Sequence, residues 1–146
     1  MDVSKIYANI LTDEQLEKVG IWRDVNEFIR IKIARSGGAN KSFARLLEAK
    51  SKPYQRAIKT DTMDTAIAER IMREVYAEAV VIGWQTKDGD EWKDIILFKD
   101  GSTANFSKAA VIRALEEFND ILIFVQDEAT KASNFLQAQR DANAGN

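Results

Sequence analysis

The side chains that carry out most enzyme chemistry are missing from this chain, which has no histidine and no cysteine among its 146 residues. Catalytic triads, thiol nucleophiles, iron–sulfur clusters and metal sites built on imidazole or thiolate are therefore excluded. The best-placed carboxylate pair is Glu74 and Glu78, four residues apart on a predicted helix. Arg70 and Arg73 stand beside them, so local ion pairs on a solvated face explain the group. We expect no enzyme activity, no catalytic residues, no cofactor and no metal.

Two loops have compositions that suggest ligand binding but lack the required spacing. Residues 88–91, Asp-Gly-Asp-Glu, resemble part of a calcium loop without the ligand positions and final glutamate of an EF-hand. Residues 35–42 lie between a predicted strand and a predicted helix, as a phosphate loop does. Their two glycines, Gly37 and Gly38, are adjacent, so the pattern G-x-x-x-x-G-K-[ST] is not met. We interpret both loops as turns, the second with Asn40 as a helix cap.

Positive charge is concentrated in one stretch of the chain. Between Phe28 and Thr60, nine basic residues stand against a single acid, Glu48, which gives this stretch +8 and leaves −10 for the remainder of a chain with net charge −2. Such a block can bind an acidic partner or nucleic acid, or it can be a solvated face balanced by acidic neighbours in the fold. Its basic residues are Arg30, Lys32, Arg35, Lys41, Arg45, Lys50, Lys52, Arg56 and Lys59.

Apolar spacing and cap residues predict five helices. Thr12 is the expected cap of the first helix, which ends at Gly20. Residues 61–62 are the expected caps of the longest helix, and Ser107 is the expected cap of the fourth. The predicted helices span Thr12–Gly20, Asn40–Ala49, Thr62–Gly83, Ser107–Phe118 and Asp120–Gln139.

Strand signals are fewer. Isoleucines alternate with other residues over Phe28–Ala34, and a period of two predicts a half-buried strand there. Asp-Gly at residues 100–101 lies between two apolar runs, which predicts a hairpin of Asp94–Phe98 and Thr103–Phe106. Because a lone hairpin is marginal in water, we expect it to share a small antiparallel sheet with the N-terminal strand. The prediction is an α+β fold, predominantly α-helical, in one domain over residues 1–140 with a disordered tail at 141–146.

Several short motifs follow one another in a recognisable order between Leu11 and Leu136. Gly83-Trp84 comes at the end of a predicted helix, and Phe106-Ser107 opens a later one. The order resembles that of the tail assembly chaperones of long non-contractile-tailed bacteriophages. In that family the Phe-Ser motif often bears a proline, whereas here Lys108 follows Ser107 and an Asp-Gly hairpin precedes it. The other motifs are Gly20-Ile21-Trp22, Ile33-Ala34-Arg35, residues 38–43, Lys52-Pro53-Tyr54, residues 74–77 and Phe135.

The resemblance implies a protein that acts in the host cell cytoplasm and is absent from the mature virion. Such chaperones bind the tape measure protein and keep it soluble while tail tube subunits polymerise around it. The tape measure protein is the expected partner, with the tail tube protein or a second copy of the chain as further partners. A membrane partner is not expected, because no apolar run approaches the length of a membrane span.

Two other functions stay open. One is a structural phage neck or tail-completion protein. The other is a nucleic-acid-binding regulator that uses the basic block, with residues 43–58 stretched into a helix-turn-helix. Pro53 and the lack of a second amphipathic helix there count against the regulator, so nucleic acid is not the expected partner.

Large apolar side chains are the expected partner contacts, with core packing as the alternative reading of each. If Phe135→Ala unfolds the protein, core packing explains the residue; if it abolishes partner binding in a folded protein, the residue lies in an interface. The predicted partner-binding residues are Trp84, Trp92, Phe106, Leu122, Val125, Phe135 and Leu136.

Overall fold

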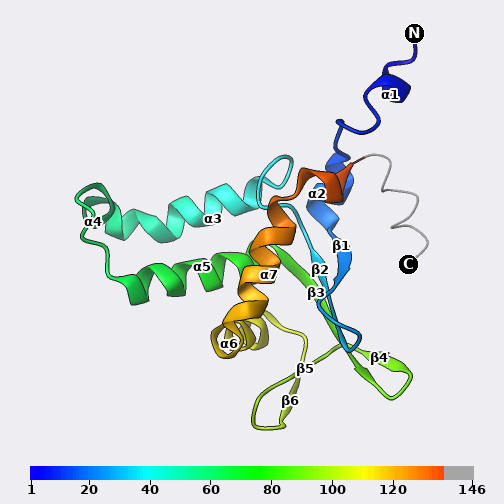
Figure 1. The fold of residues 1–146 in the computed structure, drawn as a ribbon. Helices are drawn as coiled ribbons and strands as arrows, with labels where there is room; N and C mark the ends of the chain where they lie inside the picture. The colour runs from blue at the N-terminus through cyan, green and yellow to red at the C-terminus, as the bar shows by residue number, and fades with distance from the viewer. Residues whose placement is uncertain (137–146) are drawn as a thin grey trace.

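The computed structural model describes residues 1–136 as an α+β fold (Figure 1). Helices predominate and the strands form two small antiparallel sheets, which confirms the predicted fold class. No helix in this part of the chain is both long and apolar enough to cross a membrane. The elements are α1 (Val3–Ile6), α2 (Glu14–Val19), β1 (Ile21–Asp24), β2 (Ile29–Ile33), α3 (Lys41–Ser51), η1 (Lys52–Tyr54), α4 (Gln55–Lys59), α5 (Thr65–Ala79), β3 (Val81–Asp88), β4 (Glu91–Lys93), β5 (Ile95–Leu97), β6 (Thr103–Asn105), α6 (Lys108–Glu117), α7 (Asn119–Thr130) and η2 (Ala132–Phe135).

The larger sheet has the strand order β1-β2-β3-β4, with every neighbouring pair antiparallel. The strand predicted over Phe28–Ala34 is β2, which pairs with β1 on one side and β3 on the other. Ile31 and Ile33 of this strand are fully buried, whereas Arg30 and Lys32 are only partly buried. Because successive strand residues point to opposite faces, one face of the sheet joins the core and the other carries polar and charged side chains.

The predicted Asp-Gly hairpin is confirmed, but its place in the fold differs from the prediction. It forms β5 and β6, which make a separate two-stranded sheet instead of pairing with the N-terminal strand. The edge of β3 is taken by β4, which returns through a tight turn at Gly89 (φ 64°). β5 lies against β3 through a side-chain hydrogen bond, in which the Thr86 hydroxyl donates to the Ile95 carbonyl at 2.9 Å.

The longest predicted helix, Thr62–Gly83, is too long at both ends. α5 starts at Thr65 and ends at Ala79, and residues 81–88, including Gly83-Trp84, form β3. The apolar residues that follow Ala79 are mostly β-branched, and they pair with β2 in the sheet. Gly83 leaves room for Trp22 of β1, because a Cβ at position 83 would lie 3.1 Å from its ring and would push the ring by a few tenths of an ångström.

The last predicted helix also ends early. α7 stops at Thr130, and a 3-10 turn over Ala132–Phe135 follows it. The turn places Phe135 in a small cluster with Leu16 and Ile21, where it is fully buried. The backbone N–H of Asp13 donates to the Phe135 carbonyl at 2.7 Å, which fastens this turn to the start of α2. The tail predicted at 141–146 lies outside the described residues.

Helix caps follow the predicted chemistry with shifted positions. Asp13, and not Thr12, caps α2, since its carboxylate accepts from the N–H groups of Gln15 and Leu16. Asp64 caps α5 instead of residues 61–62, which lie in the preceding turn. Ser107 caps α6 as predicted, accepting from the Ala110 N–H at 3.1 Å.

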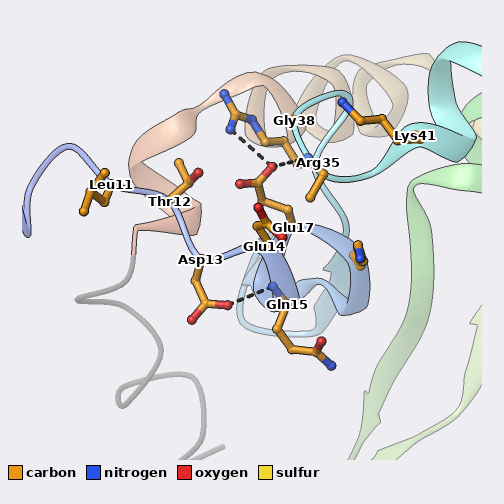
Figure 2. A pocket seen from close by; sticks show the side chains of 11 residues that line it. Leu11, Thr12, Asp13, Glu14, Gln15, Glu17, Arg35, Gly38 and Lys41 are labelled. Atoms are coloured by element: carbon orange, nitrogen blue, oxygen red, sulfur yellow. Dashed lines mark hydrogen bonds and ion pairs between the residues drawn. The ribbon is translucent and has the colours of Figure 1, made fainter. Parts of the chain in front are cut away.

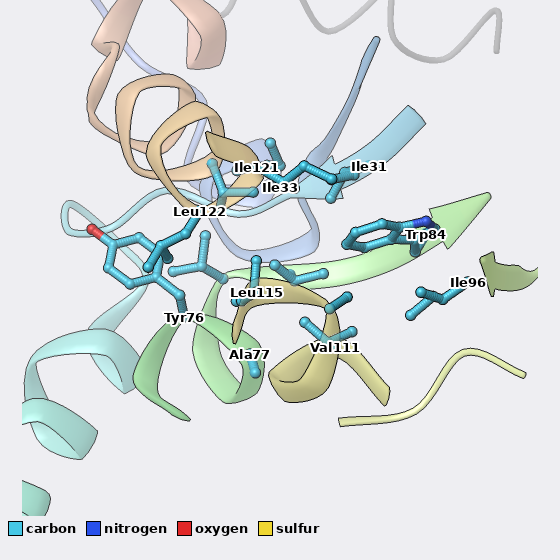
Figure 3. Packing of buried hydrophobic residues seen from close by; sticks show 14 of the residues in the cluster. Ile31, Ile33, Tyr76, Ala77, Trp84, Ile96, Val111, Leu115, Ile121 and Leu122 are labelled. Carbon is cyan, nitrogen blue, oxygen red and sulfur yellow. The ribbon is translucent and has the colours of Figure 1, made fainter. Parts of the chain in front are cut away.

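The main core lies between one face of the larger sheet and the helices α5, α6 and α7 (Figure 3). Tyr76 of α5, Leu115 of α6 and Leu122 of α7 belong to the same buried cluster as Ile31 and Trp84 of the sheet. Burial of a side chain of this size contributes roughly 1.5–3 kcal/mol. The cluster therefore holds the C-terminal part of α5 in the core. The N-terminal part of α5 extends away from the sheet beside α3 (Figure 1).

Candidate functional site

The carboxylates on α5 serve as ion-pair partners. Lys50 of α3 lies 3.3 Å from Glu74 and 3.4 Å from Glu78, and Arg70 lies 4.0 Å from Glu74. Burial lowers the pKa of Lys50, but the hydrogen bonds and charges of the two glutamates outweigh it and raise the pKa overall. Ion pairs are present as predicted, but their main partner is Lys50 of α3 and not a neighbour on α5, and Arg70 supplies the one local pair that Glu74 and Glu78 make in the described part of the chain. Nowhere in residues 1–136 do three potential metal-ligating side chains of His, Cys, Asp or Glu cluster together.

The loop between β2 and α3 binds a carboxylate of its own chain (Figure 2). Glu17 of α2 is only 2% exposed, and its Oε2 accepts from the Ala39 N–H at 2.7 Å and lies 3.3 Å from Arg35 Nη1. Burial raises the pKa of Glu17, but the Thr12 hydroxyl, the Ala39 N–H and Arg35 outweigh it and lower the pKa overall. Gly38 is needed here because a Cβ would overlap Glu17 Oε2. An internal carboxylate thus takes the backbone donor that a phosphate would need, which agrees with the interpretation of this loop as a turn.

Asn40 fixes the base of α3 in a way the sequence did not predict. It occupies the N-cap position of α3 but makes no capping hydrogen bond with its side chain. Its buried amide nitrogen instead donates to the Arg35 carbonyl at 2.8 Å and to the Ala79 carbonyl at 2.9 Å. One side chain therefore ties the start of α3 to the end of α5 and to the segment that leaves β2.

From this base, α3, η1 and α4 form a helical arm with α5 (Figure 1). Phe43 of α3 meets Tyr76 of α5 edge to face, with ring centroids 5.3 Å apart. Pro53 lies in the first turn of η1, where its missing N–H costs no hydrogen bond, so the chain continues from α3 through η1 into α4. The arm is thus held at its base by the core and along its length by contacts between α3 and α5.

The basic block divides into paired and unpaired cations. Arg35 pairs with Glu17 and Lys50 with Glu74, while Arg30 stacks between Trp22 and Trp92 at 5.2 and 4.2 Å from the ring centroids. The other cations of α3, η1 and α4 are exposed and make no ion pair within the described part of the chain. We call these residues the basic ridge: Lys41, Arg45, Lys52, Arg56 and Lys59.

A groove borders the basic ridge on α3. It has a volume of about 520 Å³, and Phe43, Ala44 and Leu47 supply its apolar lining. Residues 44 and 51 of the groove each precede a ridge cation by one position, which is about 100° around a helix. The basic ridge therefore runs along one edge of the groove. We call this hollow the α3 groove; its other lining residues are Ser36, Gly37, Glu48, Ser51 and Gln55.

The structure does not bring the seven predicted partner-binding residues to one surface. Trp84, Leu122, Val125 and Phe135 are at most 7% exposed and pack in the core, so they cannot touch a partner unless the core opens. Trp92 is partly buried and stacks on Arg30. Phe106, also partly buried, lines a hollow of about 490 Å³ with Trp84, Trp22 and others, and Leu136 forms an isolated bridge with Thr12.

The α3 groove and the basic ridge beside it were not predicted from the sequence as a binding surface. The +8 stretch of the sequence contains these cations, but the sequence alone does not tell which cations of the stretch are paired. Separating the paired from the unpaired cations requires the positions of Glu17, Glu74 and Glu78, which lie far away in sequence.

Comparison with known families assigns the origin of the chain. It is a phage-derived protein, because residues 38–146, that is 109 of its 146 residues, match the family described as YdaY prophage protein. The chain belongs to this family. The matched region starts at Gly38 and includes the basic ridge and nearly all of the α3 groove. No curated protein and no solved structure matches the chain.

Proposed function

We propose that this prophage protein is a tail assembly chaperone, which binds the tape measure protein and keeps it soluble while tail tube subunits polymerise. It acts in the host cytoplasm and leaves before the virion is complete. Membership in a prophage family supports a role in the phage life cycle. The order of motifs from Gly20-Ile21-Trp22 to Phe135 resembles tail assembly chaperones in particular.

The observation that carries the proposal is the apolar α3 groove with the basic ridge along its edge. A tape measure protein is long and mostly helical, so its apolar stripes aggregate when they are exposed. An amphipathic helix usually binds in a groove with an apolar lining and a charged edge. The groove is lined mainly by α3, whose arm extends away from the larger sheet (Figure 1).

Co-expression with the tape measure protein of the same phage tests the proposal. The two proteins are expected to co-purify, and the soluble fraction of the tape measure protein is expected to rise. Mass spectrometry of purified virions is expected to find the tape measure protein but not this chain. Absence of any complex, with no gain in client solubility, would refute the proposal, and presence in the virion would point to a structural neck or tail-completion protein instead.

A further inference from the structure

Two cations of the basic ridge have a spacing that bears on the kind of partner it could bind. Arg45 and Lys52 are seven residues apart, which corresponds to two helical turns, or about 10.5 Å. Lys59 is a further seven residues along, but it ends α4, a separate helix after the 3-10 turn η1, so it does not continue the spacing along α3. All three are exposed and have no carboxylate partner within residues 1–136. Arg45 and Lys52, two free cations two helical turns apart, are complementary to a helix with acidic residues at the same interval.

The α3 groove supplies the second half of the specificity. Its lining on α3 runs from Phe43 to Ser51, eight residues or about 12 Å of helix, so about two turns of a client helix match it. Ala44 lies in the groove beside Arg45, so apolar client side chains meet the hollow while acidic ones meet the ridge. Ile58 is 49% exposed beyond the groove, near the tip of the arm.

We infer that the arm binds an amphipathic helix whose apolar stripe is bordered, on one edge, by aspartate or glutamate at seven-residue intervals. This inference rests on the proposed function, since it names the kind of client segment that the chaperone recognises. Nucleic acid also favours a cationic surface, but it has no use for an apolar hollow of about 520 Å³ beside the cations. The combination of the two features favours a peptide helix.

Two labelled synthetic peptides test this inference by fluorescence anisotropy with the full chain. Both have the same heptad-spaced apolar stripe; one carries glutamate along one edge, and the other carries lysine in the same places. The glutamate peptide is expected to bind at least about tenfold more tightly, because several exposed charge pairs contribute together. Equal affinity of the two peptides, or no binding of either, overturns the inference.

A charge exchange sharpens the test. The double variant Arg45→Glu with Lys52→Glu should lose about tenfold in affinity for the glutamate peptide and gain affinity for the lysine peptide. Lys108→Glu, an exposed charge reversal at the start of α6, is the matched control and should change neither. Ala44→Gln fills the groove at an exposed helical position and should weaken both peptides without unfolding α3.

Two comparisons separate this inference from the proposed function. Peptide binding that follows the charge exchange, together with no tape measure complex, supports the groove and refutes the chaperone. A tape measure complex that survives both Ala44→Gln and the double charge reversal supports the chaperone and refutes the groove as its client site. Tighter binding of a DNA duplex than of the glutamate peptide, lost in the double variant, overturns the inference in favour of nucleic acid.

Discussion

Replacing Gly38 by alanine tests whether the Glu17 carboxylate really holds the loop before α3. Gly38 has φ +55°, and the left-handed backbone costs a residue with a side chain about 1 kcal/mol. The new Cβ would also overlap Glu17 Oε2, so the carboxylate must leave the Ala39 N–H. Losing a hydrogen bond to a charged group costs about 1.5–3 kcal/mol. We therefore expect the free energy of unfolding to fall by about 3 kcal/mol.

The chain contains a matched control for this substitution. Gly89 has φ +64°, and no atom lies within 4 Å of a Cβ placed there, so Gly89→Ala carries the backbone cost alone, about 1 kcal/mol. Urea denaturation at 25 °C, followed by tryptophan fluorescence, to which the buried Trp84 contributes, measures both variants. Equal losses for the two would refute the reasoning. In a Glu17→Gln background, Gly38→Ala should cost less than in the wild type, because the charged interaction is already gone.

Three further predictions concern the other buried groups. Phe135→Ala should lower the free energy of unfolding by about 3 kcal/mol, because the ring is fully buried, and thermal unfolding measures the loss; an unchanged transition would show that this ring is not a core residue. Trp92→Ala should cost only about 1 kcal/mol, since it removes the cation–π contact with Arg30 at a partly exposed site, and urea titration distinguishes this from a core loss. Glu17 and Glu128 both have a pKa lowered below the ordinary 4.5, so their stabilisation is complete above that pH and is lost as the pH falls through their lower folded-state pKa values; thermal melts from pH 7 down to pH 3 should show the loss, and it should shrink in Glu17→Gln.

Local signals in the sequence predicted the elements that depend on local chemistry. Ser107 was identified as a cap, and α6 follows it, because an N-cap hydrogen bond involves only residues three positions apart. The Asp-Gly hairpin and the strand β2 were also predicted correctly, because a turn dipeptide and a period of two are signals within a few residues. The errors fall where distant partners decide. Val81 and Trp84 read as a continuation of α5, but the pairing with β2, about 50 residues earlier, makes them a strand.

For the candidate site, the sequence predicted the excess of positive charge but not which cations are free. The excess of positive charge could be counted directly, and the absence of histidine and cysteine removed most catalytic alternatives. Which cations remain free was not predictable, because Arg35 and Lys50 find their partners 18 and 24 residues away. The predicted interface residues were chosen for size and apolarity, and those properties also select core residues such as Trp84.

The two hydrogen bonds of Asn40 have a consequence for recognition. One of them joins the start of α3 to the Ala79 carbonyl at the end of α5, and the other joins it to the Arg35 carbonyl in the segment that leaves β2. Because the first of these bonds fixes the start of α3 against the end of α5, the two helices do not have to be brought together when a ligand binds. If the arm binds a client as proposed, its base is already fixed before the encounter, so binding would cost little conformational entropy there.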